Sequence, residues 1–189
     1  EMEAIDRPFL DAYCEGRPAL EAKLRATPWD EIVAKSGVSK ADIDALADLR
    51  ASTRTPILVS EFLTTRYEYR PVLEKQAADI IMIDPTWAGG ITESKKIATM
   101  AETFKRPVAL HDCTGPFTLM AGIHLAINAT NAVYQETVRA YLRITYPDMV
   151  TEGINVEEGH ILAPTRPGIG TTLLPDIRTR PDATVVEST

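Results

Sequence analysis

The sequence lacks a long hydrophobic run, and this excludes an ordinary membrane-spanning helix. Among its 189 residues, no uncharged apolar stretch approaches the roughly 18 residues needed to cross a bilayer. The N-terminus carries acidic residues where a signal peptide would carry basic ones, and it has no apolar segment typical of such a peptide. We therefore expect a soluble, cytoplasmic protein that has no membrane partner.

Cysteine and clustered positive charge are also scarce. The two cysteines, Cys14 and Cys113, are too far apart in the sequence for a zinc knuckle or a CxxC redox pair, so we expect two free thiols. The chain has 27 acidic and 20 basic residues and a formal charge of -7, which argues against a nucleic-acid-binding surface. We expect a small-molecule partner, and an anionic one would need a cation to offset the negative field.

Two kinds of catalytic or binding motif are missing as well. The sequence has no GxSxG elbow, which disfavours a serine hydrolase. The glycines of WAGG and PGIG indicate turns but do not have the spacing of a dinucleotide-binding loop.

From residue 39 onward, helical and strand-like segments alternate. The apolar patterns predict helices at 39–50, 66–77, about 92–105 and 115–128. They predict strands within 55–61, 79–84, 106–112 and 131–136. Pro71 is expected near the first turn of its helix, where a missing N–H does little harm. This repeated βα order predicts an α/β fold with parallel strands and right-handed crossovers.

The two ends of the chain lack the βα pattern of its middle. Residues 1–38 are mostly helical in pattern but cannot be assigned to the βα repeat. Residues 146–189 are punctuated by Gly and Pro and lack a helical stripe, which predicts a hairpin and extended loops. We therefore divide the chain into 1–38, 39–145 for the βα units, and 146–189.

Four of the apolar runs end in a side chain capable of acid–base or metal chemistry. These are Glu61, Asp84, His111 and Glu136, which follow one another at intervals of 23, 27 and 25 residues. The carboxyl ends of parallel strands lie on one rim of a sheet, where α/β enzymes keep their active sites. The spacing therefore predicts that three carboxylates and an imidazole share one site.

Each of these side chains has a role that suits its chemistry. Glu61 could bind a hard cation such as Mg²⁺, which prefers oxygen ligands. Asp84 could accept the Nδ1–H of His111 and fix its tautomer, which prepares the imidazole for proton transfer. Glu136, if protonated, could donate a hydrogen bond to a developing oxyanion.

Structural alternatives remain open for the same residues. Asp84 could simply cap the following helix, and His111 could be a hydrogen-bonded structural residue. His124 lies in an apolar helix and is expected in the core, whereas His160 is expected in solvent. A nucleophilic role for Cys113 is disfavoured, because nothing in the sequence indicates a thiol of lowered pKa.

Four blocks of the chain carry a resemblance to a known family. They are TPILVSEFLTTRYEYRPVLE, ADIIMIDPTWAGGITESKKIATMAE, PVALHDCTGP and NAVYQE. Over about Ala41–Asp176 the sequence resembles the C-terminal half of the mandelate racemase/muconate lactonizing enzyme branch of the enolase superfamily. It is most similar to the acid-sugar dehydratases of the galactonate dehydratase type.

The resemblance implies both a fold and an activity. The fold would be the C-terminal part of a (β/α)7β barrel, with residues 146–189 joining a capping domain. The activity would be a Mg²⁺-dependent removal of the proton α to a sugar-acid carboxylate, through a metal-stabilised enediolate, in a homo-oligomer. By position, Glu61 matches a metal-ligating carboxylate, Asp84 and His111 match the Asp–His dyad, and Glu136 matches the acid beside the substrate carboxylate.

The sequence also departs from the family pattern. The family's catalytic Lys, its first metal-ligating Asp and the N-terminal part of its capping domain have no counterpart here, and Glu31 is a candidate for the second metal carboxylate at the wrong spacing. Ser60 stands where the family usually has Gly. We therefore expect a lyase that dehydrates a sugar acid, carried by an incomplete chain. The alternatives are a racemase or epimerase and a non-catalytic domain.

Overall fold

The computed structural model describes residues 22, 26 and 39–186. The chain divides into two compact units, Glu1–Ser39 and Lys40–Thr189, and each is considered by itself. The helical pattern predicted for residues 1–38 and the candidate ligand Glu31 lie outside the described residues, apart from Ala22 and Ala26, which are helical and exposed. The fold below is that of the second unit.

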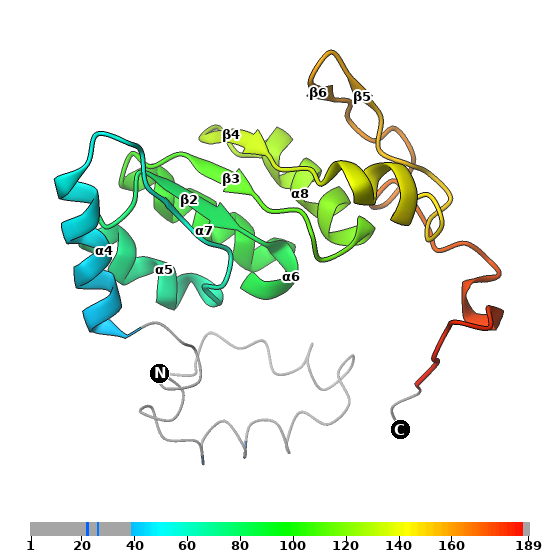
Figure 1. The fold of residues 1–189 in the computed structure, drawn as a ribbon, viewed down its shortest axis with the longest axis horizontal. Helices are drawn as coiled ribbons and strands as arrows, with labels where there is room; N and C mark the ends of the chain where they lie inside the picture. Colours follow the sequence, from blue (N-terminus) through cyan, green and yellow to red (C-terminus); the bar gives the residue numbers. More distant parts are fainter. Residues whose placement is uncertain (1–21, 23–25, 27–38, 187–189) are drawn as a thin grey trace, which may run out of the picture. The chain divides into compact units, whose positions relative to one another are not determined.

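A parallel four-stranded sheet is the centre of this unit (Figure 1). Its strands, in spatial order, are β1 (Leu58–Val59), β2 (Ile80–Ile83), β3 (Val108–Leu110) and β4 (Ala132–Gln135). All neighbouring pairs are parallel, with a register shift between Val108 and Ala109 where β3 meets β4. The predicted α/β class and the parallel strands are confirmed.

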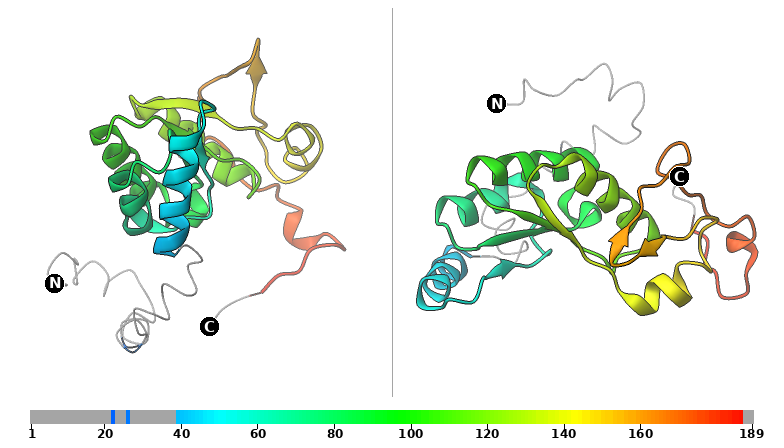
Figure 2. Two further views of the ribbon diagram at one scale, coloured as in Figure 1. Left: turned by 60° about the vertical axis from the view of Figure 1, so that its left-hand side comes forward. Right: turned by 90° about the horizontal axis from the view of Figure 1, so that it is seen from above.

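The four helices that the sequence predicts are present in the predicted order, and the structure adds a short helix after β2 where the sequence indicated a turn. These helices are α4 (Lys40–Ser52), α5 (Thr65–Glu74), α6 (Pro85–Ala88), α7 (Ile91–Thr103) and α8 (Pro116–Asn128). The three long helices after β1 (α5, α7 and α8) lie on the same side of the sheet, as Figure 2 shows. One long helix thus follows each of β1, β2 and β3 and packs back on the sheet, and the short α6 lies between β2 and α7.

Pro71 differs from its predicted place. It lies inside α5, well beyond the first turn that begins after the N-cap Thr64. A proline there removes one backbone hydrogen bond. The helix nevertheless continues, because the next two side chains, Val72 and Leu73, are 1% exposed and pack into the core.

The core lies between the sheet and its helices. All three residues of β3 are buried, as expected for a central strand of a parallel sheet that is covered by helices. The side chains that fill this layer are almost entirely aliphatic; they include Ile81, Ile83, Val108, Leu110, Ile97, Ala101 and Leu119. This rigid layer holds the strand ends in fixed positions.

The C-terminal segment forms smaller elements around a second cluster. They are a π-helix (Tyr141–Thr145), the antiparallel strands β5 (Val156–Glu157) and β6 (His160–Ile161), and a 3₁₀ helix (Ile177–Thr179). Tyr146 packs here against Leu119, Met120 and Ile123 of α8. The hairpin that the sequence predicts is present, whereas the three-segment division and the capping role of 146–189 stay predictions. No helix in the described part of the chain could span a membrane.

Candidate active site

The four predicted site residues follow the four strands at the same edge of the sheet. Asp84, His111 and Glu136 come directly after β2, β3 and β4, and Glu61 lies two residues after β1. The strand ladder continues into the site, because the His111 N–H donates to the Ile83 carbonyl at 3.0 Å and the Glu136 N–H donates to the Leu110 carbonyl at 2.8 Å. Backbone hydrogen bonds of the sheet therefore fix where these side chains begin.

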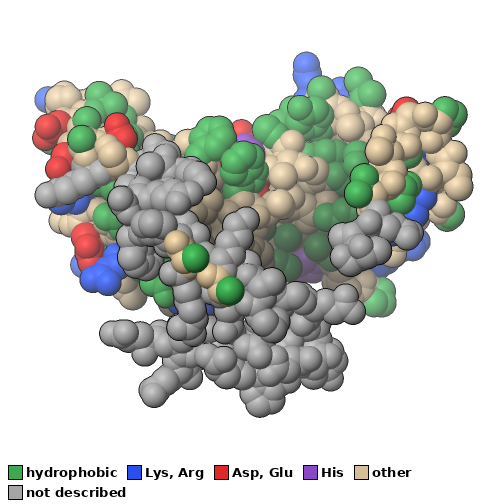
Figure 3. Space-filling view, turned by 90° about the horizontal axis from the view of Figure 1, so that it is seen from below, with side chains coloured by type: hydrophobic (Ala, Val, Ile, Leu, Met, Phe, Trp, Pro, Cys, Tyr) green, Lys and Arg blue, Asp and Glu red, His purple; other side chains and the backbone are tan. Residues whose placement is uncertain are grey.

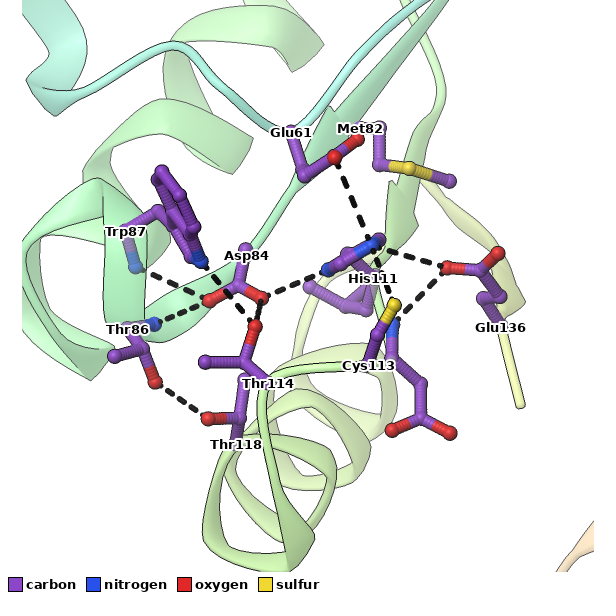
Figure 4. Close-up of polar contacts among 12 residues, drawn as sticks. Glu61, Met82, Asp84, Thr86, Trp87, His111, Cys113, Thr114, Thr118 and Glu136 are labelled. Carbon is purple, nitrogen blue, oxygen red and sulfur yellow. Dashed lines mark hydrogen bonds and ion pairs between the residues drawn. The ribbon is translucent and has the colours of Figure 1, made fainter. Parts of the chain in front are cut away.

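The side chains converge on the imidazole of His111 (Figure 4). Its Nδ1 lies 2.8 Å from Oδ2 of Asp84, a hydrogen-bond distance. Its Nε2 faces the other two carboxylates, 3.9 Å from Oε1 of Glu61 and 3.7 Å from Oε2 of Glu136. The structure thus brings all four residues together around one ring.

Asp84 makes the contacts of both alternatives that the sequence left open, the helix cap and the pairing with His111. Its Oδ1 accepts hydrogen bonds from the backbone N–H groups of Thr86 at 2.7 Å and Trp87 at 3.1 Å, so it caps α6. Its Oδ2 faces His111 and also accepts a hydrogen bond from the hydroxyl of Thr114 at 2.6 Å. The carboxylate is fully buried, and its donors replace the water that it has lost.

Glu136 is held by a residue to which sequence reasoning assigned no role. The backbone N–H of Asp112 donates to Oε2 of Glu136 at 3.0 Å. The Asp112 side chain is itself fully buried and accepts hydrogen bonds from the Val138 N–H at 2.8 Å and the Tyr146 hydroxyl at 2.5 Å. Burial raises the pKa of the Asp112 carboxyl, although the hydrogen bond from Tyr146 opposes the rise.

Cys113 lies beside the ring but is not poised as a nucleophile. Its Sγ is 3.7 Å from Nε2 of His111. Although Cys113 is exposed as a residue, burial of the thiol raises its pKa, and the carboxylates of Glu136 and Asp112 raise it further. A reactive thiolate requires the opposite shift.

The other two histidines lie away from this cluster of side chains. His124 is half-buried on α8, with Nε2 3.2 Å from the carbonyl oxygen of Ile169. His160 is exposed at the β5–β6 hairpin, with Nδ1 3.1 Å from the carbonyl of Glu158. His160 is solvated as expected, whereas His124 has a hydrogen-bond partner but is only half-buried and not in the core.

The described residues fit a metal ion only in part. Glu61 offers a carboxylate at the rim, with its side chain 16% exposed. Within residues 39–186, however, no group of three or more His, Cys, Asp or Glu side chains could hold a metal ion. These residues therefore do not form a complete metal site.

Sequence reasoning also missed two side chains that contact the dyad region, Thr114 and Trp87. The Trp87 indole Nε1–H donates to Oγ1 of Thr114 at 3.3 Å. The Trp87 ring is 47% exposed and packs edge-to-face on Phe62, which is 57% exposed. Thr114 lies in the polar cluster after β3, which could have marked it, whereas WAGG was interpreted only as a turn.

Large apolar groups thus adjoin the acidic cluster. Figure 3 shows histidine (purple) and acidic (red) atoms beside hydrophobic side chains (green) in the upper middle of the view.

Comparisons with known proteins show what this chain is similar to. Residues 37–177 match the family described as enolase C-terminal domain-like. The D-galactonate dehydratase of Xanthomonas campestris is 32% identical over 171 residues, which cover 87% of this chain and 45% of the relative. The D-xylonate dehydratase of Haloferax volcanii is 37% identical over 122 residues, which cover 65% of this chain and 29% of that enzyme.

Solved structures show the same relationship. The crystal structure of an enolase protein from environmental sequencing of the Sargasso Sea has a TM-score of 0.72 and 49% sequence identity, over 78% of this chain and 39% of that one. The chain spans less than half the length of these relatives. The four-stranded sheet matches part of the enolase C-terminal barrel domain, whose superfamily typically uses a divalent metal. This chain therefore belongs to the enolase superfamily, as a mandelate racemase/muconate lactonizing enzyme C-terminal domain whose homologues include acid-sugar dehydratases.

Proposed function

We propose that this chain carries the Asp–His part of the active site of a lyase that dehydrates a sugar acid. The observation that carries the proposal is the buried Asp84–His111 pair, 2.8 Å apart at the carboxyl ends of adjacent parallel strands, with Glu61 and Glu136 facing the other ring nitrogen. The dehydratase activities of the similar proteins from Xanthomonas campestris and Haloferax volcanii support the reaction class.

His111 is the group that moves the proton. Asp84 orients the ring through Nδ1, which leaves Nε2 on the open side of the dyad. Nε2 accepts the proton from the carbon α to the substrate carboxylate and then gives it to the hydroxyl that departs from the β carbon as water. One imidazole can serve both steps, because it is a base when neutral and an acid once protonated.

Glu136 and Glu61 face the same space with different roles. Glu136 lies beside the substrate carboxylate, where, if protonated, it donates a hydrogen bond to the oxyanion that develops. Glu61 is the proposed ligand to Mg²⁺, the cofactor whose positive charge would stabilise the carboxylate of the substrate. Glu61 is the one Mg²⁺ ligand proposed among the described residues. The proton transfer described above therefore involves protein side chains and no metal-bound group.

The decisive experiment is turnover of a panel of sugar acids, with Mg²⁺ present, by the 189-residue chain and its His111→Asn variant. We expect wild-type dehydration of at least one sugar acid and a loss of about a thousandfold or more in the variant, since Asn cannot transfer a proton. Equal activity of the two proteins would remove His111 from the mechanism. Absence of turnover in the wild-type chain, together with no Mg²⁺ binding by calorimetry, would favour the non-catalytic alternative.

A second measurement separates dehydration from racemisation or epimerisation. In D₂O, a racemase or epimerase returns a solvent deuteron to the same carbon, whereas a dehydratase releases water and forms a keto acid. Deuterium in recovered substrate without loss of water would contradict the dehydratase assignment. The sugar-acid substrate, a homo-oligomeric state and a cytoplasmic location stay predictions that belong to this proposal.

A further inference from the structure

The hydrogen bonds around Asp84 run in one direction, and Trp87 sets that direction. An indole N–H can only donate, so Thr114 must accept in its 3.3 Å contact with Nε1 of Trp87. The single hydroxyl proton of Thr114 is then directed to Oδ2 of Asp84, 2.6 Å away. The order Trp87 to Thr114 to Asp84 follows from the chemistry of the donors alone.

Asp84 must in turn be an acceptor toward His111. Its Oδ1 already accepts from two backbone N–H groups, which can only donate hydrogen bonds. Its Oδ2 accepts from Thr114. An oxygen that accepts from Thr114 can also accept across the 2.8 Å contact to Nδ1, which places the shared proton on the imidazole nitrogen.

The opposite ring nitrogen is left as the acceptor in the neutral imidazole. The carboxylates of Glu61 and Glu136 are 3.9 Å and 3.7 Å from Nε2, too far for a hydrogen bond that would keep a proton there. Cys113, whose pKa is raised, keeps its S–H and lies 3.7 Å from Nε2, so it can act as a weak donor to this nitrogen. Asp84, on Nδ1, is the one carboxylate of the three within hydrogen-bond distance of the ring, and this contact favours a proton on Nδ1.

We propose that Trp87 and Thr114 are positioning residues that act through Asp84 to keep the proton of neutral His111 on Nδ1 and leave Nε2 able to accept. The catalytic meaning of this arrangement rests on the proposed function, because a base at Nε2 is what proton abstraction needs. The Trp87 ring is 47% exposed beside Phe62, so the link runs from the molecular surface to the buried dyad.

The test reads the tautomer of His111 directly by NMR of the ¹⁵N-histidine-labelled chain, at one alkaline pH where the imidazoles are neutral. In the wild type we expect the Nδ1–H pattern for His111. Thr114→Ser keeps the hydroxyl and should retain this pattern. Thr114→Val removes the hydroxyl, and Trp87→Phe removes the indole N–H but keeps an aromatic ring. In both, the His111 signals should move toward mixed tautomers, with exchange of the Nδ1 proton about tenfold faster.

The same spectra contain their controls. Signals of His124 and His160 should stay unchanged, and His111→Asn assigns the remaining set. An Nε2–H pattern in the wild type would overturn the proposal. So would unchanged His111 signals in Thr114→Val and Trp87→Phe, even if both variants melted at lower temperature, since that would mean a purely structural role. Because the tautomer is read without substrate, a failure here is distinguishable from failure to find a sugar-acid substrate.

Discussion

At the residue scale, Asp84 combines two functions that substitution can separate. Asparagine retains a carbonyl oxygen that can accept from the Thr86 and Trp87 amides, so Asp84→Asn should keep the cap of α6. Its amide N–H₂ would face Nδ1 of His111 and force the wrong tautomer. We expect kcat to fall by about a thousandfold or more in Asp84→Asn, measured with the sugar acid that the wild type turns over.

Asp84→Ala provides the matched comparison, because it removes the cap as well as the dyad. We expect its free energy of unfolding to fall by about 1 kcal/mol more than that of Asp84→Asn in urea denaturation. Equal stabilities of the two variants would show that the cap contributes little. Retained activity in Asp84→Asn would contradict the orienting role of the carboxylate.

Cys113 gives a prediction about reactivity rather than turnover. Its pKa is raised, so at a given pH less of the thiol is ionised than in a free cysteine, and alkylation requires the thiolate. The rate of iodoacetamide alkylation of Cys113, measured against pH in a Cys14→Ser background, should reach half its maximum at a higher pH than for a cysteine in a short peptide. If the pH of half-maximal alkylation were lower than that of the peptide, a nucleophilic role for Cys113, which the sequence disfavoured, would again be favoured.

Site residues at strand ends could be predicted from the sequence, whereas residues held by contacts between irregular segments could not. Glu61, Asp84, His111 and Glu136 could be placed together from the sequence, because parallel strands bring their carboxyl ends to one edge whatever the loops do. The polar cluster after β3 marks Asp112 and Thr114 as candidates, but their roles could not be predicted, since their partners Tyr146 and Trp87 lie far from them in the sequence and on other elements. Contacts made through irregular segments leave no periodic signal.

At the element scale, Asp79 joins α4 to the first two strands. Just before β2, its Oδ1 accepts from Arg50 of α4 at 2.7 Å and its Oδ2 accepts from the N–H of Ile57, just before β1, at 2.9 Å. The hydrogen bond from Ile57 is the main reason that the pKa of Asp79 is lowered, and Arg50 adds to it. A lowered pKa stabilises the fold at pH above the unfolded-state pKa, and this contribution is lost as the pH falls through the folded-state value.

Asp79→Asn should therefore lower the free energy of unfolding by about 1 kcal/mol at neutral pH, in urea denaturation. The difference between wild type and variant should shrink as the pH falls below the ordinary value of 3.8. Asp48→Asn removes the same charge from an exposed position of α4 and is the control. A difference that stays constant from neutral to acidic pH would show that packing, not the ionised carboxylate, explains the effect.

Element order was foreseen better than element detail. The four strands and the helices between them could be predicted because their apolar patterns reflect burial on the sheet, as the fully buried β3 shows. The position of Pro71 inside α5 could not, since the burial of Val72 and Leu73 outweighs the local preference of proline. The π-helix Tyr141–Thr145 was likewise unforeseen, because such turns follow tertiary packing rather than sequence period.

At the scale of the whole molecule, the two edge strands of the sheet determine how the chain can associate with other chains. In the described unit, β1 and β4 are the outer strands of the four-stranded sheet. Exposed apolar side chains lie on both, with Leu58 39% exposed, Val133 48% and Tyr134 69%. Unpaired strand edges that carry apolar side chains favour pairing with another chain.

We therefore expect the 189-residue chain to self-associate as its concentration rises. Val133→Lys on β4 should weaken that association by about tenfold or more, because a charge on an edge strand opposes edge-to-edge pairing. Sedimentation velocity over a range of concentrations measures the change. Val186→Lys adds the same charge at a residue 84% exposed and outside every strand, so it controls for the shift in net charge from -7. If both lysine variants weakened association equally, general repulsion would explain the result, whereas a selective effect of Val133→Lys would identify β4 as the associating edge.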